Sequence, residues 1–325
     1  MRIDHAPMEG ITNYLYRQAF AHCFGGVDRF YTPFLSPNQN HRFTRREWDE
    51  IDPAHNEGME VVPQLLANDP ANFLWACGEL KALGYREVNL NAGCPSGTVT
   101  AKRKGSGMLA DPAALDAFLG TVCAGLDGMR LSVKTRIGIR DEAEFAALLD
   151  VYARYPLAEL IVHPRLQKDF YARPVRAKVF ATAISACPFP LGYNGDLFSA
   201  EDVHALAARC PELNSVMLAR GIVANPALAL ETKGTGARNK AALAEFHAQL
   251  YENCAARLPG DCALLNHMKE WWYYVLPLFT NAAQYEKPLR KAERRAEYEA
   301  LTHRLFQTEA LLPSAHFTPA YPPSL

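Results

Sequence analysis

The sequence predicts a (β/α)₈ (TIM) barrel followed by a C-terminal all-α helical domain. Short apolar, β-favouring runs recur along the first two thirds of the chain, and a segment with helical periodicity follows each run. This recurrence gives eight β-then-α units, for which about 250 residues is typical. After about residue 232 the strand signal stops, and the pattern is helical to about residue 307. A doubly wound open sheet is the structural alternative.

The expected strands lie in order along the first 220 residues. They are residues 2–8, 28–34, 60–66, 86–92, 130–137, 158–164, 189–195 and 214–220. Several of the intervening helices carry start signals. Asp69 can cap a helix whose first turn holds Pro70, and Ser199 is followed closely by acidic residues. The segment 141–155 also has acidic residues in its first turn, as the helix dipole favours.

A change in amino-acid composition marks the domain boundary. The stretch "ETKGTGARNK" at 231–240 is rich in Gly, Thr and charge, which is typical of a linker. We therefore expect a catalytic barrel over residues 1–234, a helical domain over 235–310 and a proline-rich tail over 311–325 that is loose or draped on the surface. Within the helical domain, "EWWYYVLPLF" at 270–279 is interpreted as core, although a tryptophan at its edge could stack on a base.

Composition excludes several classes of protein. Eight scattered cysteines without a C-x-x-C pair argue against a zinc site and a disulfide scaffold, so no metal is expected. No apolar run approaches the ~20 residues of a membrane helix, and the N-terminus lacks a signal-peptide core. We expect a monomer in a reducing cytoplasm, without membrane contact. The net charge of −1 means that any nucleic-acid partner must be met by a local patch.

Polar side chains stand at the same end of at least five expected strands. A buried parallel strand should be nearly continuous Val, Ile and Leu, so Lys134 and His163 are costly unless paired. The other polar or chemically special residues at strand ends are Met8, Gln64, Asn89, Asn91, Cys94, Arg136, Arg165, Asn194, Gly195, Asp196, Arg220 and Gly221. Each alone has a structural explanation. The lysine could extend its amine to solvent, the histidine could be a hydrogen-bonded structural residue, the Asn-Gly pair could form a turn, and the cysteine could be a buried, unreactive thiol. Their coincidence indicates a site at the C-terminal face of the barrel.

The last two strand ends also fit a phosphate site. Barrels often bind phosphate with the loops after strands seven and eight. Gly195 and Gly221 allow close backbone approach, and Arg220 can supply a fork of donors. Two glycine turns beside a surface arginine are the alternative interpretation.

Eight short motifs together resemble one family. They are "APMEGITN" at 6–13, "PQLLA" at 63–67, "VNLNAGCPS" at 88–96, "GSGMLA" at 105–110, "VKTRIG" at 133–138, "VHPR" at 162–165, "YNGD" at 193–196 and "MLARG" at 217–221. In order and spacing they resemble the tRNA-dihydrouridine synthases, over nearly the whole chain. The segment around Cys94 is the most specific of them. One departure is visible: Pro164-Arg165-Leu166 stands where the family often has glycine, arginine and threonine, so position 166 lacks the hydroxyl that the family often has there.

The resemblance implies an FMN-dependent barrel enzyme that reduces the C5–C6 double bond of particular uridines in tRNA with NADPH as hydride donor. Cys94 would be the catalytic acid, Asn91 would lie against the target uracil, and Arg136 near the substrate. The cofactor would be held by Pro7, Met8, Gln64, Lys134, His163, Asn194, Gly195, Asp196, Arg220 and Gly221.

The implied chemistry explains the residue types. Lys134 would stabilise negative charge on the reduced flavin. The carbon that receives the proton needs an acid on the opposite face, and a thiol suits this role because its reference pKa of ~8.5 keeps it mostly protonated near neutrality. The loop from Lys102 to Gly107, with Arg103 and Lys104, would be mobile and positive and would close over the substrate.

The RNA-binding prediction depends on surface cations. A cluster in the last expected helix could place several of them on one face: Lys287, Arg290, Lys291, Arg294 and Arg295. A solvated, salt-bridged helix is the alternative for this cluster, and Arg290 and Arg294 are the contacts we name. For the whole chain, two other functions stay open: a dihydroorotate-dehydrogenase-like reductase of a small pyrimidine, and an RNA-binding module that has lost catalysis.

Overall fold

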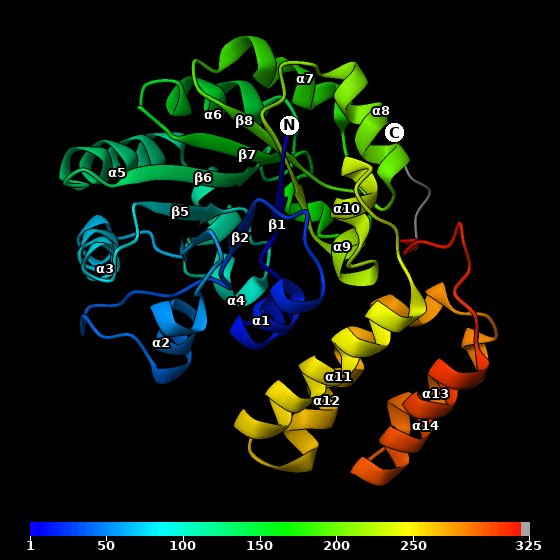
Figure 1. Ribbon diagram of the computed structural model, residues 1–325. Coiled ribbons are helices and arrows are strands. Elements are labelled where there is room, and N and C mark those ends of the chain that lie inside the picture. Colours follow the sequence, from blue (N-terminus) through cyan, green and yellow to red (C-terminus); the bar gives the residue numbers. More distant parts are fainter. Residues whose placement is uncertain (320–325) are drawn as a thin grey trace.

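The computed structural model describes residues 1–319 and shows a parallel barrel with a helical region beside it (Figure 1). All strands lie in one sheet of order β3-β2-β1-β9-β8-β7-β6-β5-β4. Their bounds are β1 Arg2–His5, β2 Arg29–Tyr31, β3 Val61–Val62, β4 Gln64–Leu65, β5 Glu87–Ala92, β6 Arg130–Arg136, β7 Glu159–His163, β8 Leu191–Asn194 and β9 Ser215–Leu218. The predicted barrel is confirmed.

The third expected strand is divided at Pro63. Proline has no N–H to donate to a ladder, so β3 ends at Val62 and β4 begins at Gln64. β3 pairs with β2, whereas β4 pairs with β5. The Gln64 N–H donates to the hydroxyl of Thr32 over 3.0 Å, which holds the two halves together where the sheet closes. This closure places the Gln64 side chain inside the barrel mouth.

The helices that surround the barrel follow the strands in order. They are α1 Tyr14–Cys23, α2 Arg45–Ile51, α3 Pro70–Ala82, α4 Gly97–Thr100, α5 Pro112–Gly125, α6 Glu144–Tyr152, α7 Ala177–Ala186, α8 Ala200–Arg209, α9 Arg220–Ala224 and α10 Leu228–Lys233, with 3₁₀ turns η1 Pro53–His55, η2 Gly105–Ala110 and η3 Gln167–Asp169. The expected caps are present: Asp69 accepts from the Asn72 N–H, and Ser199 forms a capping box with Asp202. α6 starts at Glu144, three residues later than the predicted segment.

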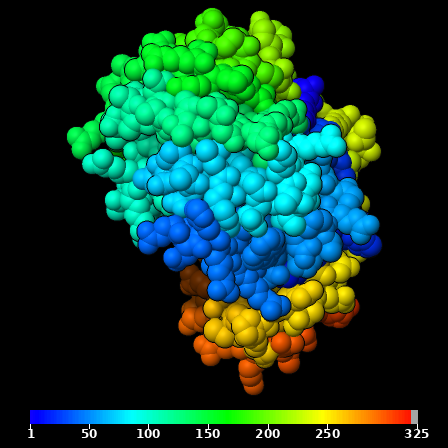
Figure 2. All heavy atoms as spheres, turned by 90° about the vertical axis from the view of Figure 1, so that its left-hand side faces the viewer, coloured from blue at the N-terminus to red at the C-terminus, as the bar shows by residue number. Residues whose placement is uncertain are grey.

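The helical region consists of α11 Lys240–Arg257, α12 Gly260–Val275, η4 Leu276–Leu278, α13 Ala282–Lys291 and α14 Arg295–Thr308. It packs directly on the barrel. Phe246 of α11 meets Phe20 and Phe24 of the α1 region at ring-centroid distances of 6.4 and 5.7 Å. In Figure 2 the yellow-to-red helical region is continuous with the blue N-terminal part of the molecule. No helix in the described residues is long and apolar enough to cross a membrane.

Two predictions about this region are wrong. The expected last helix is two helices, because the chain leaves α13 at Ala292, which is buried with an extended backbone (φ −60°, ψ 122°). Arg290 and Arg294 therefore lie on different elements and do not share a helix face. The tryptophans of 270–279 are also not at an edge. Trp271 and Trp272 are both buried in the core, and the exposed position is Tyr273.

The segment that follows α14 runs back toward the barrel (Figure 1, red). Leu311 forms a bridge with Phe279, and the Leu312 N–H donates to the Leu278 carbonyl over 2.8 Å. Farther along, Phe317 is 7 % exposed. The described part of the predicted tail, residues 311–319, is therefore held against the surface, and residues 320–325 lie outside the described chain.

Candidate active site

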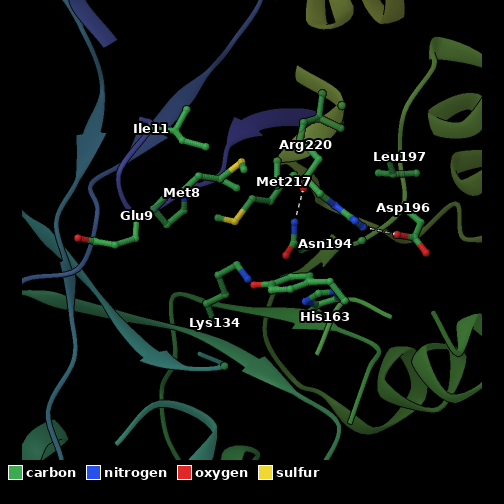
Figure 3. Close-up of a pocket in the computed structure, with 18 of the residues that line it drawn as sticks. Met8, Glu9, Ile11, Lys134, His163, Asn194, Asp196, Leu197, Met217 and Arg220 are labelled. Carbon is green, nitrogen blue, oxygen red and sulfur yellow. Dashed lines mark hydrogen bonds and ion pairs between the residues drawn. The ribbon is translucent and has the colours of Figure 1, made fainter. Parts of the chain in front are cut away.

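A cavity of about 530 Å³ opens at the C-terminal ends of the strands (Figure 3). That volume falls within the range of about 300–1,000 Å³ that is typical of ligand sites. The cavity brings together every predicted cofactor residue and both residues predicted to face the reacting base. They are Pro7, Met8, Gln64, Asn91, Cys94, Lys134, His163, Asn194, Gly195, Asp196, Arg220 and Gly221. Residues far apart in the sequence share one hollow because parallel strands end at the same face.

The strand exit that carries Cys94 is fixed by side-chain hydrogen bonds. Asn91 accepts from the backbone N–H groups of Gly93 and Cys94 over 3.1 and 2.9 Å. From the other side, Arg136 donates its Nε–H to the Gly93 carbonyl over 2.9 Å. Asn91 also donates to Gln64 Oε1 over 2.7 Å, so one asparagine links β5 to β4 and orients the thiol-bearing turn.

The loop after Cys94 folds back onto it. Ser106 donates both its N–H and its hydroxyl to the Cys94 carbonyl, over 3.0 and 2.9 Å. Gly105 has φ +57°, and a Cβ there would lie 2.7 Å from that same carbonyl oxygen. Only glycine fits this contact without a shift. Gly105 therefore allows the loop to close over the cysteine.

Lys134 is a partly buried amine at the cavity wall. It stands opposite Asn91 in the register of β5 and β6, and its remaining exposure is toward the cavity. Burial, with a smaller contribution from nearby Arg136, lowers the pKa of Lys134 to about 7. No ion pair is formed by Lys134 within residues 1–319. A ligand that accepts a hydrogen bond or carries negative charge would satisfy this amine.

His163 is held as a neutral imidazole of one tautomer. Its Nε2 lies 2.7 Å from Nη1 of Arg165, and since a guanidinium only donates, Nε2 must be the acceptor and Nδ1 carries the proton. Burial and the neighbouring Arg136 and Arg165 place the pKa of His163 well below its ordinary value. The ring therefore offers one fixed donor and no charge.

An arginine pair surrounds Asp196 at the next strand end. Arg165 donates to both Asp196 oxygens over 2.8 and 2.6 Å, and both side chains are fully buried. Arg220 donates to Asp196 Oδ1 over 2.9 Å (Figure 3). Two guanidinium cations share one carboxylate, so this end of the cavity keeps an excess positive charge, as an anion-binding site requires.

The two predicted glycines lie where other parts of the chain approach the backbone closely. A Cβ on Gly221 would be 2.1 Å from the Leu197 carbonyl oxygen. At Gly195, φ is +143°, and a Cβ would meet Val175 at 2.8 Å and His163 at 3.1 Å. Directly before Gly195, Asn194 donates to the Met217 carbonyl over 2.7 Å, which ties β8 to β9.

Six predicted substrate residues lie outside the cavity lining. Arg136 is buried and donates to three backbone carbonyls, those of Gly93, Leu166 and Phe170. That geometry positions two loops, and the guanidinium is not part of the cavity lining. The others are on the surface: Lys102, Arg103 and Lys104 in the turn after α4, and Arg290 and Arg294 at the break between α13 and α14.

Aromatic residues at the mouth were not predicted from the sequence. Tyr171, Phe198, Tyr273, Tyr274 and Phe317 all line the cavity. Tyr273 and Tyr171 are 67 and 53 % exposed, which is unusual for such large side chains. Their segments come from a loop, a helix and the tail, so no motif spacing could have joined them. For Tyr273, the sequence offered only the helical periodicity of 270–279, which leaves part of that aromatic run at the edge of the core.

The fold and the cavity define a class: a parallel barrel enzyme with a thiol, a partly buried lysine and an arginine-rich anion site at its C-terminal face. The sequence model of the dihydrouridine synthase family matches residues 4–311, and the chain belongs to that family. The predicted family and enzyme class, an oxidoreductase that forms dihydrouridine, are confirmed.

Similar proteins agree with this assignment. The tRNA-dihydrouridine(16) synthase of Ralstonia nicotianae is 27 % identical over 312 residues, covering 91 % of this chain and 93 % of the relative. The probable tRNA-dihydrouridine synthase 1 of Synechocystis sp. is 31 % identical over 252 residues, covering 74 % of this chain and 67 % of the relative. Among solved structures, the old yellow enzyme homologue from Zymomonas mobilis has a TM-score of 0.51 at 11 % identity, covering 73 % of this chain and 90 % of that structure. That last likeness concerns the fold alone.

Proposed function

We propose that this protein is a tRNA-dihydrouridine synthase that uses FMN and NADPH to reduce uridine 16 of tRNA. The observation that carries the proposal is the convergence of Cys94, Lys134, His163 and Arg220 on one cavity. Family membership supplies the reaction, and relatives named for position 16 match over nearly their full length. A tRNA substrate would be met in the cytoplasm.

The cavity residues fit FMN. Arg220 would hold the phosphate at the positive end of the cavity, where Gly195 and Gly221 also line the wall. Gln64 and Asn194 would form hydrogen bonds with the edges of the flavin ring system. His163 would donate a hydrogen bond from its Nδ1–H. α9 has only five residues, so Arg220 itself, and not a helix dipole, would provide the charge there. When bound, FMN supplies the hydride for the C5–C6 bond of uracil.

Lys134 would complement the negative charge that the ring carries after reduction. Near pH 7, an amine with a pKa of about 7 is protonated in only about half of the ligand-free molecules. An anion beside the amine would raise its pKa and keep it protonated. The lysine would therefore hold its proton more firmly in the reduced enzyme than in the empty one.

Cys94 would donate the proton to C5. The thiol lines the cavity, and its turn is held by Asn91, Arg136 and Ser106. A thiol whose turn is held in this way fits general acid catalysis, where geometry is the first requirement. Asn91 keeps one amide hydrogen beyond its bond to Gln64 and would meet a uracil carbonyl. The base must leave its stack to reach this depth.

Mapping dihydrouridine in cellular tRNA tests the proposal. A strain lacking the gene should lose dihydrouridine at position 16 and regain it when the wild-type gene is returned. The purified protein should be yellow, and NADPH should bleach its flavin absorbance. Loss at another position would overturn the assignment to uridine 16. Reduction of free pyrimidines in place of tRNA would favour the small-molecule reductase, and a colourless protein that binds tRNA would favour the RNA-binding module.

A further inference from the structure

The segment after α14 returns to the active-site mouth through a series of backbone anchors. The Thr280 N–H donates to the Ala310 carbonyl over 2.9 Å, and the Leu312 N–H donates to the Leu278 carbonyl over 2.8 Å. Arg238, in the linker between barrel and helical region, donates to the Ala315 carbonyl. We call residues 309–319 the C-terminal strap. Its course delivers Phe317 and Pro319 to the cavity wall.

Phe317 is packed in a cluster of rings from other parts of the chain. Its ring centroid lies 5.7 Å from Phe198, in the loop after β8, and 5.3 Å from Tyr274 of α12. Ala224 of α9 completes the contact. Phe317 is buried in this cluster although the strap itself has no regular secondary structure around it. This burial indicates that the strap is part of the site wall.

The rings form a cage around the arginine of the anion site. The Arg220 guanidinium carbon lies 5.3 Å from the Phe198 ring, 5.6 Å from the Tyr171 ring and 5.7 Å from the Phe317 ring. All three distances lie within the ~6 Å of a cation–π contact. The bond from Arg220 to Asp196 fixes one edge of the same guanidinium. The arginine is therefore restrained both by its edge and by its faces.

We propose that Phe317 is a positioning residue for Arg220, and that the C-terminal strap thereby controls how tightly the anion site holds the cofactor phosphate. This inference rests on the proposed function, in which Arg220 binds the FMN phosphate. Without the Phe317 ring, the guanidinium loses one restraining face and one barrier to water. More of its side-chain freedom must then be lost when phosphate binds, and the charge is better screened before binding.

Through the C-terminal strap, Phe317 would couple two regions that lie far apart in the sequence. The strap is anchored on η4 and the linker, so the helical region holds one wall of the barrel's anion site. Tyr274 makes the same connection from α12. A change in the helical region that moves the strap would therefore alter the restraint on the Arg220 guanidinium.

Paired ligands separate an effect through Arg220 from a general loosening of the wall. FMN and riboflavin share the same ring system, but only FMN carries the phosphate. Flavin fluorescence titrations of ligand-free protein give both dissociation constants. For Phe317→Ala we expect FMN binding about 2- to 30-fold weaker, in proportion to the loss of one cation–π contact, with riboflavin binding unchanged. Phe317→Tyr should keep wild-type affinity, whereas Phe317→Leu, which keeps bulk without a ring face, should resemble alanine.

Two controls complete the test. Leu312→Ala changes an exposed strap residue outside the cavity lining and should alter neither affinity. In the Arg220→Ala background, Phe317→Ala should add nothing to the loss of FMN affinity. Equal weakening of FMN and riboflavin, or no weakening of either, would overturn the role assigned to Phe317. A wild-type protein that binds no FMN would instead overturn the proposed function.

Discussion

At the residue scale, Cys94 separates the two halves of the proposed reaction. Cys94→Ala should keep FMN and still have its flavin reduced by NADPH, because neither step needs the thiol proton. Turnover on tRNA should fall by roughly 10²–10⁴-fold, the usual contribution of a general acid. Stopped-flow flavin absorbance measures the first half-reaction, and dihydrouridine formation under single-turnover conditions measures the second. If this variant turned over tRNA at the wild-type rate, Cys94 would not be the general acid.

Lys134 gives the ligand-free protein a predictable pH dependence. The unfolded chain keeps this proton to about pH 10.4, whereas in the folded protein the pKa is lowered to about 7. The unfolded state therefore binds more protons between these values, and the Lys134 contribution to stability rises with pH across that window. Each pH unit changes it by at most about 1.4 kcal/mol.

We expect Lys134→Met to raise the melting temperature of the ligand-free protein most at pH 7 and less at pH 9. Thermal unfolding of both proteins at several pH values measures the difference, and about 2–4 °C corresponds to 1 kcal/mol for a chain of this kind. A difference that does not change with pH would show that the buried amine keeps its proton.

At the element scale, the segment from α4 to η2 contacts the turn that carries Cys94 through Gly105 and Ser106. Gly105→Ala would force a side chain into a left-handed conformation and against the Cys94 carbonyl oxygen. We expect a loss of about 1–3 kcal/mol in stability and a drop in tRNA turnover, with FMN affinity unchanged.

A matched control lies eight residues earlier. A methyl group added at Gly97 would have no atom within 4 Å, and Gly97 opens the short helix α4. Gly97→Ala should be neutral or slightly stabilising. If both variants behaved alike, the close approach at Gly105 would not be what positions Cys94.

The strands could be predicted because a parallel barrel requires buried, apolar runs, and the exceptions to that rule marked the site. Lys134 and His163 stood out for this reason, and both line the cavity. The end of α13 could not be predicted, because Ala292 leaves the helix to enter a core that exists only in the folded chain. Arg136 is a similar case. Its strand position was visible, but whether it faces a ligand or three carbonyls depends on where the loops lie.

At the scale of the whole molecule, the barrel and the helical region share one hydrophobic core. Residues from α1, α11, α12 and α14 belong to the same buried cluster as the barrel strands. A chain stopped at Gly234 would expose the face of α1 that holds Phe20. The helical region therefore cannot be removed to test RNA binding without also destabilising the barrel, and surface charges offer the cleaner experiment.

If tRNA spans both regions, two separate groups of cations should each contribute to the salt dependence of binding. Arg290→Ala with Arg294→Ala removes charges at the α13–α14 break, and Lys102→Ala with Arg103→Ala removes charges beside the catalytic loop; all four side chains are exposed. Each lost phosphate contact should reduce the slope of log affinity against log salt by about 0.7–0.9. The combined variant should show the sum, because the two groups share no contacts.

Titration of tRNA at several salt concentrations measures these slopes. Arg209→Ala is the matched control, since it removes an exposed arginine from the last turn of α8, at the opposite end of the barrel from the cavity. An unchanged slope for Arg290→Ala with Arg294→Ala would make that break a solvated surface. RNA docking would then be assigned to the barrel loops alone, and the helical region would act on the site only through the C-terminal strap.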